Sequence, residues 1–222
     1  MLSPSLNLLT SLGLLLTTTL ALPTATPPFH VRAKQSAALS LPASTLPSPP
    51  PGTTLKYIAL GLGTQNYTCA SPSASSPPMS AGALATLYDA TARLSLPSGA
   101  IQIPKLPGTS LKSGNGLGLP VLGQHHFTSS LVPCFDLAAA SPPLFLSAHK
   151  AASAPAPADA DAGPARSGAV DWLELLDDGR GATRGLSAVF RVETAGGKAG
   201  SCEGVGAGGM QVAYAAEYWF YG

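Results

Sequence analysis

The histidines are the first residues to consider, because a histidine side chain can act as a general base or bind a metal ion. His125 and His126 are adjacent, so in a strand they point to opposite faces and cannot both bind one metal ion. His30 and His149 lie in low-complexity segments, and the sequence holds no H-E-x-x-H, C-x-x-C or G-x-S-x-G motif. We therefore expect no metal site, and His125 becomes the first candidate for a catalytic base.

Several polar and aromatic residues lie near His125 in the sequence, namely Gln124, Phe127 and Asp136. A histidine in a loop that begins with a glycine, here Gly123, and that has an aromatic residue nearby can donate to a ligand or act as a general base. The alternative, which we favour, is a histidine that hydrogen-bonds a neighbouring loop and holds the fold. Asp136 and Glu217 are the carboxylates that would work with His125, although Glu217 fits a solvated strand position better.

The sequence does not decide whether two carboxylates form a pair that hydrolyses glycosides, because the required separation of about 5–10 Å is a property of the fold. Asp171 and Glu174 fall on opposite faces of a strand. Arg191 and Glu193 share a face and resemble an exposed cross-strand pair. A metal site would need carboxylates to converge on one histidine. The six carboxylates considered are Asp89, Asp136, Asp171, Glu174, Glu193 and Glu217.

Aromatic residues gather near the C-terminus with a two-residue period, which is typical of a strand. Tyr214, Tyr218 and Phe220 share one face, and we expect them in the core. Trp219 and Tyr221 lie on the other face, where they would form a stacking surface for sugar rings. A second covering layer of the protein would explain these two residues equally well.

One glycine run matches a dinucleotide-binding motif literally. Residues 204–209 read GVGAGG, which satisfies G-x-G-x-x-G. Such glycines must follow a strand and open a helix, whereas this run precedes a strand-patterned segment. Gly61 and Gly63 follow a strand but lack the third glycine. We interpret all of them as turn or close-packing glycines and expect no cofactor.

The elements that must position these residues are predicted to be strands. Segment 186–194 places Leu186, Ala188, Phe190 and Val192 on one face and Arg191 on the other. The 24 glycines and 22 prolines make up roughly a fifth of the chain against an average of about 12%, which argues against an all-helical fold. We predict a mainly β, single-domain β-sandwich or partly closed β-barrel with long Pro/Gly-rich loops.

Helices are predicted to be almost absent, and the composition excludes one class of partner. Only residues 82–92 fit a helix, and they fit a strand almost as well; residues 71–78 and 105–119 are predicted as loops. Charged residues make up 10% of the chain and the net charge is +1, so no nucleic-acid-binding surface is expected.

The N-terminus carries a predicted targeting segment. The uncharged apolar run 6–22 and the small-x-small sequence at 19–21 indicate a secretory signal peptide over residues 1–21. A buried or membrane helix is the alternative. Residues 22–52 are predicted to be a linker or pro-segment. Residues 53–222 then form the β-rich domain, with a low-complexity loop insertion at 148–168. We expect a secreted monomer that has no membrane contact after signal removal.

Cysteines and a sequon fit an oxidising compartment. Asn66 begins the sequon Asn-Tyr-Thr and is the predicted glycosylation site. Three cysteines allow at most one internal bridge, and the preferred pair is Cys69 with Cys202, which would stabilise the fold by about 4 kcal/mol. Cys134 is interpreted as a buried free thiol, and a reactive or intermolecular cysteine is the alternative.

Several motifs of this chain resemble those of one known family. The longest is YIALGLGTQNYTC at residues 57–69; the others lie at 85–91, 123–127, 133–137, 170–175, 191–197, Cys202 and 214–220. Over roughly residues 53–221 the chain resembles a domain-of-unknown-function family of secreted fungal proteins that also has bacterial members. The family includes proteins expressed in the appressoria of plant-pathogenic fungi, so the resemblance implies a role at the host surface. Its members often carry a malate dehydrogenase label, which the glycine motifs here do not support, and the resemblance supplies no catalytic residues.

These observations favour a secreted, non-enzymatic protein that acts at the fungal cell wall or host surface. Its expected partner is a cell-wall polysaccharide or a host-surface protein, with Gln124, Trp219 and Tyr221 as candidate binding residues. The alternative is a secreted carbohydrate hydrolase that uses His125 and a carboxylate. A structural wall component is the third hypothesis.

Overall fold

The computed structural model describes residues 39–73, 75–206 and 209–222. The predicted signal peptide 1–21, His30 and residues 22–38 of the predicted linker lie outside this range. The elements within it are β1 (Leu55–Thr68), β2 (Met79–Asp89), α1 (Thr91–Leu94), α2 (Gly99–Gln102), η1 (Ile103–Lys105), α3 (Leu106–Ser113), β3 (Val121–Phe127), β4 (Pro133–Leu137), β5 (Leu144–Ala154), β6 (Trp172–Asp177), β7 (Ala188–Gly196) and β8 (Met210–Tyr221).

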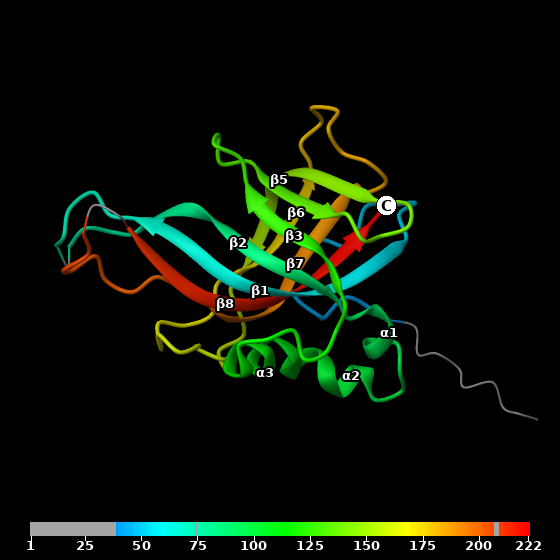
Figure 1. The fold of residues 1–222 in the computed structure, drawn as a ribbon, viewed down its shortest axis with the longest axis horizontal. Helices are drawn as coiled ribbons and strands as arrows, with labels where there is room; N and C mark the ends of the chain where they lie inside the picture. The colour runs from blue at the N-terminus through cyan, green and yellow to red at the C-terminus, as the bar shows by residue number, and fades with distance from the viewer. Residues whose placement is uncertain (1–38, 74, 207–208) are drawn as a thin grey trace, which may run out of the picture. The chain divides into compact units, whose positions relative to one another are not determined.

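The strands form one closed antiparallel barrel, in which each strand pairs with its neighbours in the sequence and β8 pairs with β1 (Figure 1). The predicted mainly β class with a barrel architecture is confirmed, and the sheet closes fully. The β1–β8 pairing runs from Leu55 opposite Tyr221 to Tyr67 opposite Met210. It joins the first strand to the last, which removes the exposed edges of an open sheet.

Side chains from alternate strand positions fill the inside of the barrel. Tyr214, Tyr218 and Phe220 of β8 lie there as predicted, and none is more than 1% exposed. Gly61 of β1 makes room for one of these rings, because a Cβ at this position would lie 2.5 Å from Cε2 of Tyr218. The position therefore needs glycine because the Tyr218 ring packs directly against it.

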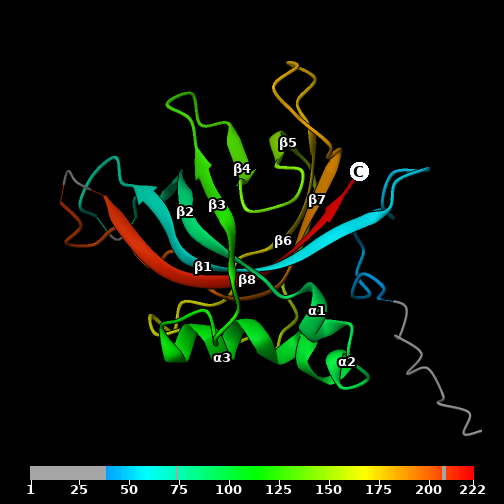
Figure 2. The same cartoon turned by 45° about the vertical axis from the view of Figure 1, so that its right-hand side comes forward.

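A second layer covers the outer side of β1, β7 and β8. Helix α3 packs against these three strands, with Leu111 touching Ala195 and Ala215, and the helices lie together on one side of the barrel (Figure 2). The prediction of a loop over 105–119 is therefore wrong in its first half. Leu106, Pro107, Ser110 and Leu111 form the buried face of a helix that ends at Gly114, whose φ is 65°. No helix of the described part has the length and apolar content needed to cross a bilayer.

The N-terminal part of the described chain belongs to this outer layer as well. Leu39, Leu41 and Leu46 are partly buried and pack against the outer cluster that contains Trp219. Residues 39–46 are thus part of the packed structure and not a free linker, which corrects the prediction for that end of residues 22–52. The three leucines supply the apolar surface that the Pro/Ser-rich composition around them lacks.

Two other boundaries differ from the sequence-based expectation. Residues 82–89 belong to β2, so the strand alternative is the correct one for most of segment 82–92. Strand β5 continues to Ala154, so only the later part of the predicted loop 148–168 is a loop. The alanine-rich sequence of 148–154 does not predict a strand, but pairing with β6 holds it extended, for example Ser153 opposite Leu173.

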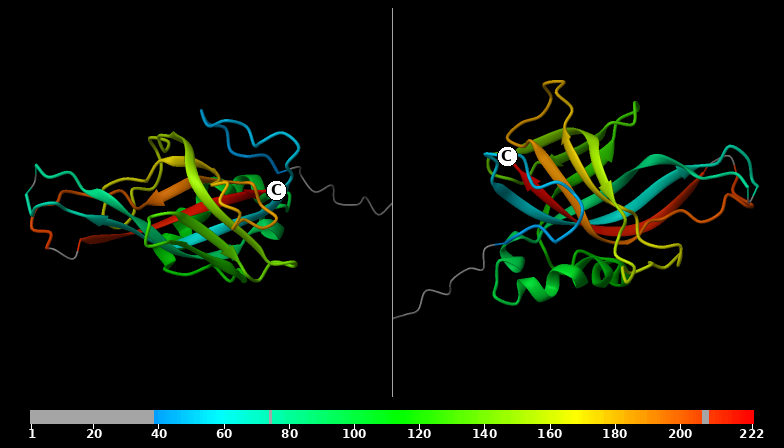
Figure 3. Two further views of the ribbon diagram at one scale, coloured as in Figure 1. Left: turned by 90° about the horizontal axis from the view of Figure 1, so that it is seen from above. Right: turned by 180° about the vertical axis from the view of Figure 1, so that it is seen from behind.

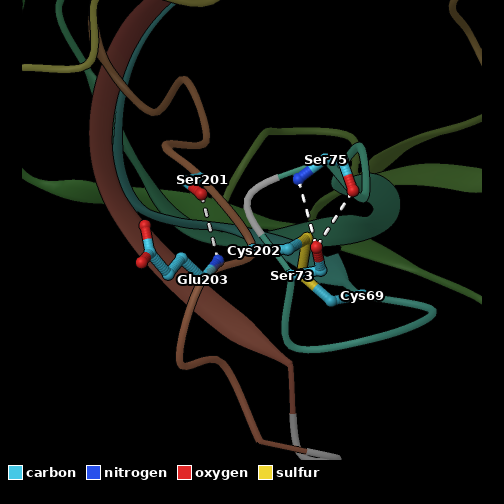
Figure 4. Close-up of a disulfide and its surroundings, with 6 residues drawn as sticks. All are labelled: Cys69, Ser73, Ser75, Ser201, Cys202 and Glu203. Carbon is cyan, nitrogen blue, oxygen red and sulfur yellow. Dashed lines mark hydrogen bonds between the residues drawn. A yellow bond between two sulfur atoms is a disulfide. The ribbon is translucent and has the colours of Figure 1, made fainter.

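The predicted disulfide between Cys69 and Cys202 is confirmed, with the two Cα atoms 5.8 Å apart. It joins the loop after β1 to the loop before β8 (Figure 4), so it fastens together the far ends of two strands that already pair. Cys134 is a buried free thiol, as predicted, and burial raises its pKa.

We expect replacement of both Cys69 and Cys202 by serine to lower the free energy of unfolding by about 2–5 kcal/mol, because the bridge closes a loop with a sequence separation of 133 residues. Urea unfolding of the wild type and the double variant would measure this difference. A reductant should lower the midpoint of the wild type alone. Equal midpoints for both oxidised proteins would contradict the prediction.

Candidate functional site

His125 lies inside the barrel and is 3% exposed. Its ring stacks on Phe135 with the centroids 4.2 Å apart, and Nδ1 donates to the carbonyl oxygen of Cys134 at 2.9 Å. Burial lowers the pKa of His125 to about 3, which outweighs the hydrogen bond to Cys134, and the charge of Arg191 acts in the same direction. The ring is therefore neutral at physiological pH and holds β3 against β4.

The carboxylates proposed to work with His125 lie elsewhere. Asp136 and Gln124 are opposite each other on β4 and β3 and face the outer side of the barrel, away from His125. Glu217 lies on the outer side of β8 and is fully buried. The structure therefore brings Gln124 and Asp136 together but separates His125, Asp136 and Glu217 into three places.

Trp219 and Tyr221 do not form an exposed stacking surface. Trp219 is 0% and Tyr221 is 7% exposed, because both lie in the outer cluster under the covering layer. The covering-layer alternative is thus the correct one, and the proposal of a sugar-binding platform at these two residues is wrong. The same layer explains why Glu217 is buried and not solvated.

Glu217 is a buried carboxyl group with one partner. Trp219 Nε1 donates to Glu217 Oε2 at 2.9 Å, and Oε1 has no hydrogen-bond partner among the described residues. Burial raises the pKa of Glu217 to about 8, which outweighs the hydrogen bond from Trp219, and Glu193 raises it further. At neutral pH the group is therefore mostly protonated and uncharged.

A cavity of about 580 Å³ is lined by residues of β1 to β7, among them Pro133 and Ala148, which lie where β4 and β5 separate. Strand β5 pairs with β4 only from Leu144 to Ser147; from Ala148 onward its pairing partner is β6. The lining includes residues of the hairpin between β3 and β4 and of the second half of β5; Figure 3 shows the backbone of the barrel from above and from behind. We call this cavity the wall pocket; its lining includes Gln65, Tyr67, Phe127, Lys150, Leu173 and Arg191.

Arg191 of β7 is the charged group at the inner end of the wall pocket and is 9% exposed. Its Nε and Nη2 atoms both donate to the carbonyl oxygen of Asp171, at 3.2 and 2.8 Å. The ion pairs within the described ranges join Lys112 to Asp161 and Arg180 to Asp178, so Arg191 has no carboxylate partner there. A buried guanidinium without a counter-ion is costly, by several kcal/mol, and an anionic ligand would reduce that cost.

Gln65 places a second donor at the same end of the wall pocket. Its side chain is 6% exposed and lies near the Tyr214 hydroxyl, but Nε2 has no hydrogen-bond partner of normal geometry in the described part of the chain. Tyr67, two residues along β1, uses its hydroxyl to donate to the carbonyl oxygen of Gly197 at 2.7 Å. The inner end of the pocket therefore offers donors that lack acceptors.

The sequence-based placement of Arg191 on an exposed face with Glu193 is wrong. Strand β7 is buried on both sides, because the outer layer covers Phe190 while Val189 and Arg191 face inward. The run of three apolar residues at 188–190 is the signal that was missed, since it is typical of a strand buried on both faces. Glu193 lies at an irregularity of β7, with a φ of 48°, and is half-buried.

Asn66, the predicted glycosylation site, lies within β1. Its side chain is partly exposed, and Oδ1 accepts a hydrogen bond from the Thr64 hydroxyl at 3.1 Å. Because Gln65 and Tyr67 on either side line the wall pocket, Asn66 points to the outside. Glycosylation at this position stays a prediction.

The glycine-rich run 204–209 leads into β8 and not into a helix; residues 207–208 lie outside the described range. It therefore lacks the helix N-terminus that holds a dinucleotide phosphate. No group of three or more metal-binding side chains gathers in the part of the chain that the structure describes.

Residues 49–222 match a family model that is described as a protein of unknown function (DUF3455). No curated protein and no solved structure matches the chain. The matched range contains all eight strands of the barrel, and with them every residue that lines the wall pocket.

Proposed function

We propose that this chain, which belongs to the DUF3455 family of proteins of unknown function, is a secreted, non-enzymatic protein that binds a ligand in the wall pocket. The observation that supports this most is the meeting of two buried, under-used polar side chains, Arg191 and Gln65, at one cavity. The volume of about 580 Å³ lies in the range of small-molecule sites, roughly 300–1,000 Å³. An eight-stranded barrel is also just wide enough to hold one small ligand.

Secretion is the second part of the proposal. Its support is the Cys69–Cys202 disulfide, since such bonds persist in oxidising compartments, together with the apolar run at residues 6–22. A location at the fungal cell wall or host surface, a host-surface protein as partner and a monomeric state rest on the sequence alone.

For polysaccharide binding, the wall pocket replaces Trp219 and Tyr221 as the proposed site, because these two residues are buried. Such a pocket would take the end of a sugar chain and not a long stretch of it. The hydrolase hypothesis receives no support from the geometry, since His125, Asp136 and Glu217 do not converge.

Replacing Ser153 by tryptophan tests the proposed site, because Ser153 is an exposed residue that lines the wall pocket. We expect the added indole to weaken ligand binding at least about tenfold by occupying the entrance. Ser113→Trp, on the exposed end of α3, is the matched control and should bind like the wild type. Titration calorimetry would measure binding of chitin, β-glucan and cellulose oligosaccharides, glucuronate and alkyl carboxylates.

Binding of at least one compound by the wild type and by Ser113→Trp, but not by Ser153→Trp, would support the proposal. If no compound binds, or if Ser153→Trp binds as well as the wild type, the proposed site is wrong. Mass spectrometry of the same mixtures would detect shortened oligosaccharides, and their appearance would overturn the non-enzymatic part.

A further inference from the structure

We infer that the wall pocket selects an amphipathic carboxylate, that is, a carboxylate group attached to an apolar body. This inference rests on the proposed function and adds the chemistry of the ligand. The carboxylate would lie at the inner end of the pocket against Arg191 and Gln65, and the apolar body would lie along the pocket walls.

The polar atoms at the inner end favour an acceptor-only group. The Arg191 guanidinium carries five N–H groups, and its bonds to the Asp171 carbonyl oxygen use Nε and Nη2. The Tyr218 hydroxyl also lies close to the guanidinium, and the remaining N–H groups include both hydrogens of Nη1, enough to hold the two oxygens of a carboxylate. Gln65 Nε2 adds two more N–H groups without a partner in the described residues.

A neutral sugar fits this end less well. Each sugar hydroxyl brings a hydrogen that needs an acceptor, while Arg191 and the Gln65 amide nitrogen offer only donors. The Asp171 carbonyl oxygen already accepts two hydrogen bonds from Arg191. The Tyr67 hydroxyl already donates its hydrogen to Gly197, so its oxygen has room for one hydrogen bond from a sugar. An anion also supplies the counter-charge that Arg191 lacks.

The walls and the rim argue against a small inorganic anion. Phe127, Leu173 and Leu175 give the pocket an apolar surface, which sulfate or phosphate would leave in contact with water. Lys150, Arg180, Arg191 and Lys198 bring four positive charges to the lining, and Asp171 and Asp178 bring two negative ones, so the lining is cationic on balance. The Asp178 carboxylate is already bonded to the Ser147 hydroxyl at 2.6 Å. Apolar walls below a cationic lining fit a ligand with one charged end.

Calorimetric titration of the full secreted protein with octanoate tests the inference, with 1-octanol and octylammonium as probes of equal chain length. We expect octanoate to bind in a 1:1 ratio and the two other probes to bind at least about tenfold more weakly. Glucuronate and sulfate, which carry the charge without an apolar body, should also bind at least about tenfold more weakly. This comparison uses only the wild-type protein, so it does not depend on the folding of any variant.

Variants then locate the site. Arg191→Met should weaken octanoate binding at least about tenfold, and Arg191→Lys should have an intermediate effect because it keeps the charge but loses the fork of donors. Gln65→Met should reduce the affinity severalfold. Lys56→Met removes an exposed cation outside the wall pocket and should bind octanoate like the wild type.

The outcomes separate this inference from the proposed function. If a neutral oligosaccharide binds, Ser153→Trp blocks it and octanoate does not bind, the wall pocket stands as a site and the carboxylate inference is wrong. Equal binding of octanoate and 1-octanol, or of octanoate by wild type and folded Arg191→Met, also overturns the inference. Octanoate binding that depends on its charge, on Arg191 and on an open entrance supports both.

Discussion

Replacing Glu217 by glutamine is expected to remove a contribution that lowers the free energy of unfolding as the pH rises from about 4.5 to about 8. In the unfolded chain the carboxyl group has an ordinary pKa and ionises as the pH rises through the lower value. In the folded barrel, burial keeps it protonated until about pH 8. The stability contributed by the protonated group is therefore fully present below pH 4.5 and is lost by pH 8, at roughly 1.4 kcal/mol per pH unit.

Urea unfolding of wild type and Glu217→Gln at pH 5, 6.5 and 8 would measure this effect. Glu203→Gln, at an exposed carboxylate in the loop before β8, is the matched control and should follow the wild type. The emission of Trp219 gives a local signal, since its Nε1 donates to Glu217, and it should change near pH 8 in the wild type alone. Parallel pH curves for wild type and Glu217→Gln would show that the carboxyl group does not stay protonated in the fold.

Replacing His125 by phenylalanine is expected to remove a slope of the opposite sign at acidic pH. The folded-state pKa of His125 is lowered from 6.5 to about 3, mainly by burial. As the pH falls below 6.5 the unfolded chain takes up a proton that the folded protein does not, so stability is lost down to about pH 3, again at roughly 1.4 kcal/mol per pH unit. Phenylalanine keeps the stacking on Phe135 and cannot titrate.

The difference in unfolding free energy between wild type and His125→Phe, measured from pH 3.5 to pH 7, isolates this contribution. His149→Phe replaces an exposed histidine and should run parallel to the wild type. A constant difference between wild type and His125→Phe across this range would contradict the prediction. From the pKa shifts of Glu217 and His125 we expect the two contributions to cancel between about pH 4.5 and 6.5. The free energy of unfolding should then fall below about pH 4.5 and above about pH 6.5.

The inner face of the barrel could be predicted from the sequence because its signal is local. The two-residue period of 212–220 identified Tyr214, Tyr218 and Phe220 as core, and the structure places all three inside. The cysteine pair 69 and 202 was also accessible, since only three cysteines had to be sorted. Both conclusions needed only spacing and residue type.

The outer layer could not be predicted in the same way, and the errors at the site follow from it. Nothing in the alternation of β7 and β8 says that Phe190, Glu217 and Trp219 are covered, because the cover comes from α3 and from residues 39–46, far away in the sequence. Once the outer face was taken as exposed, Arg191 was placed there and the wall pocket was missed. The proline at the start of α3 and Gly114 at its end were the local signals for the helix, but the Ser/Gly/Pro content of 105–119 obscured them.

The short pairing between β4 and β5 has a consequence for backbone hydrogen exchange. From Ala148 to Ala154, strand β5 pairs with β6 on one side, and β4 has already ended on the other. Amide hydrogens that point toward this open side lack a ladder partner, so they should exchange with deuterium far sooner than those of the long β1–β8 pairing. A bound ligand would slow exchange in this stretch first, so deuterium uptake by the second half of β5 would report occupancy of the barrel without an attached dye.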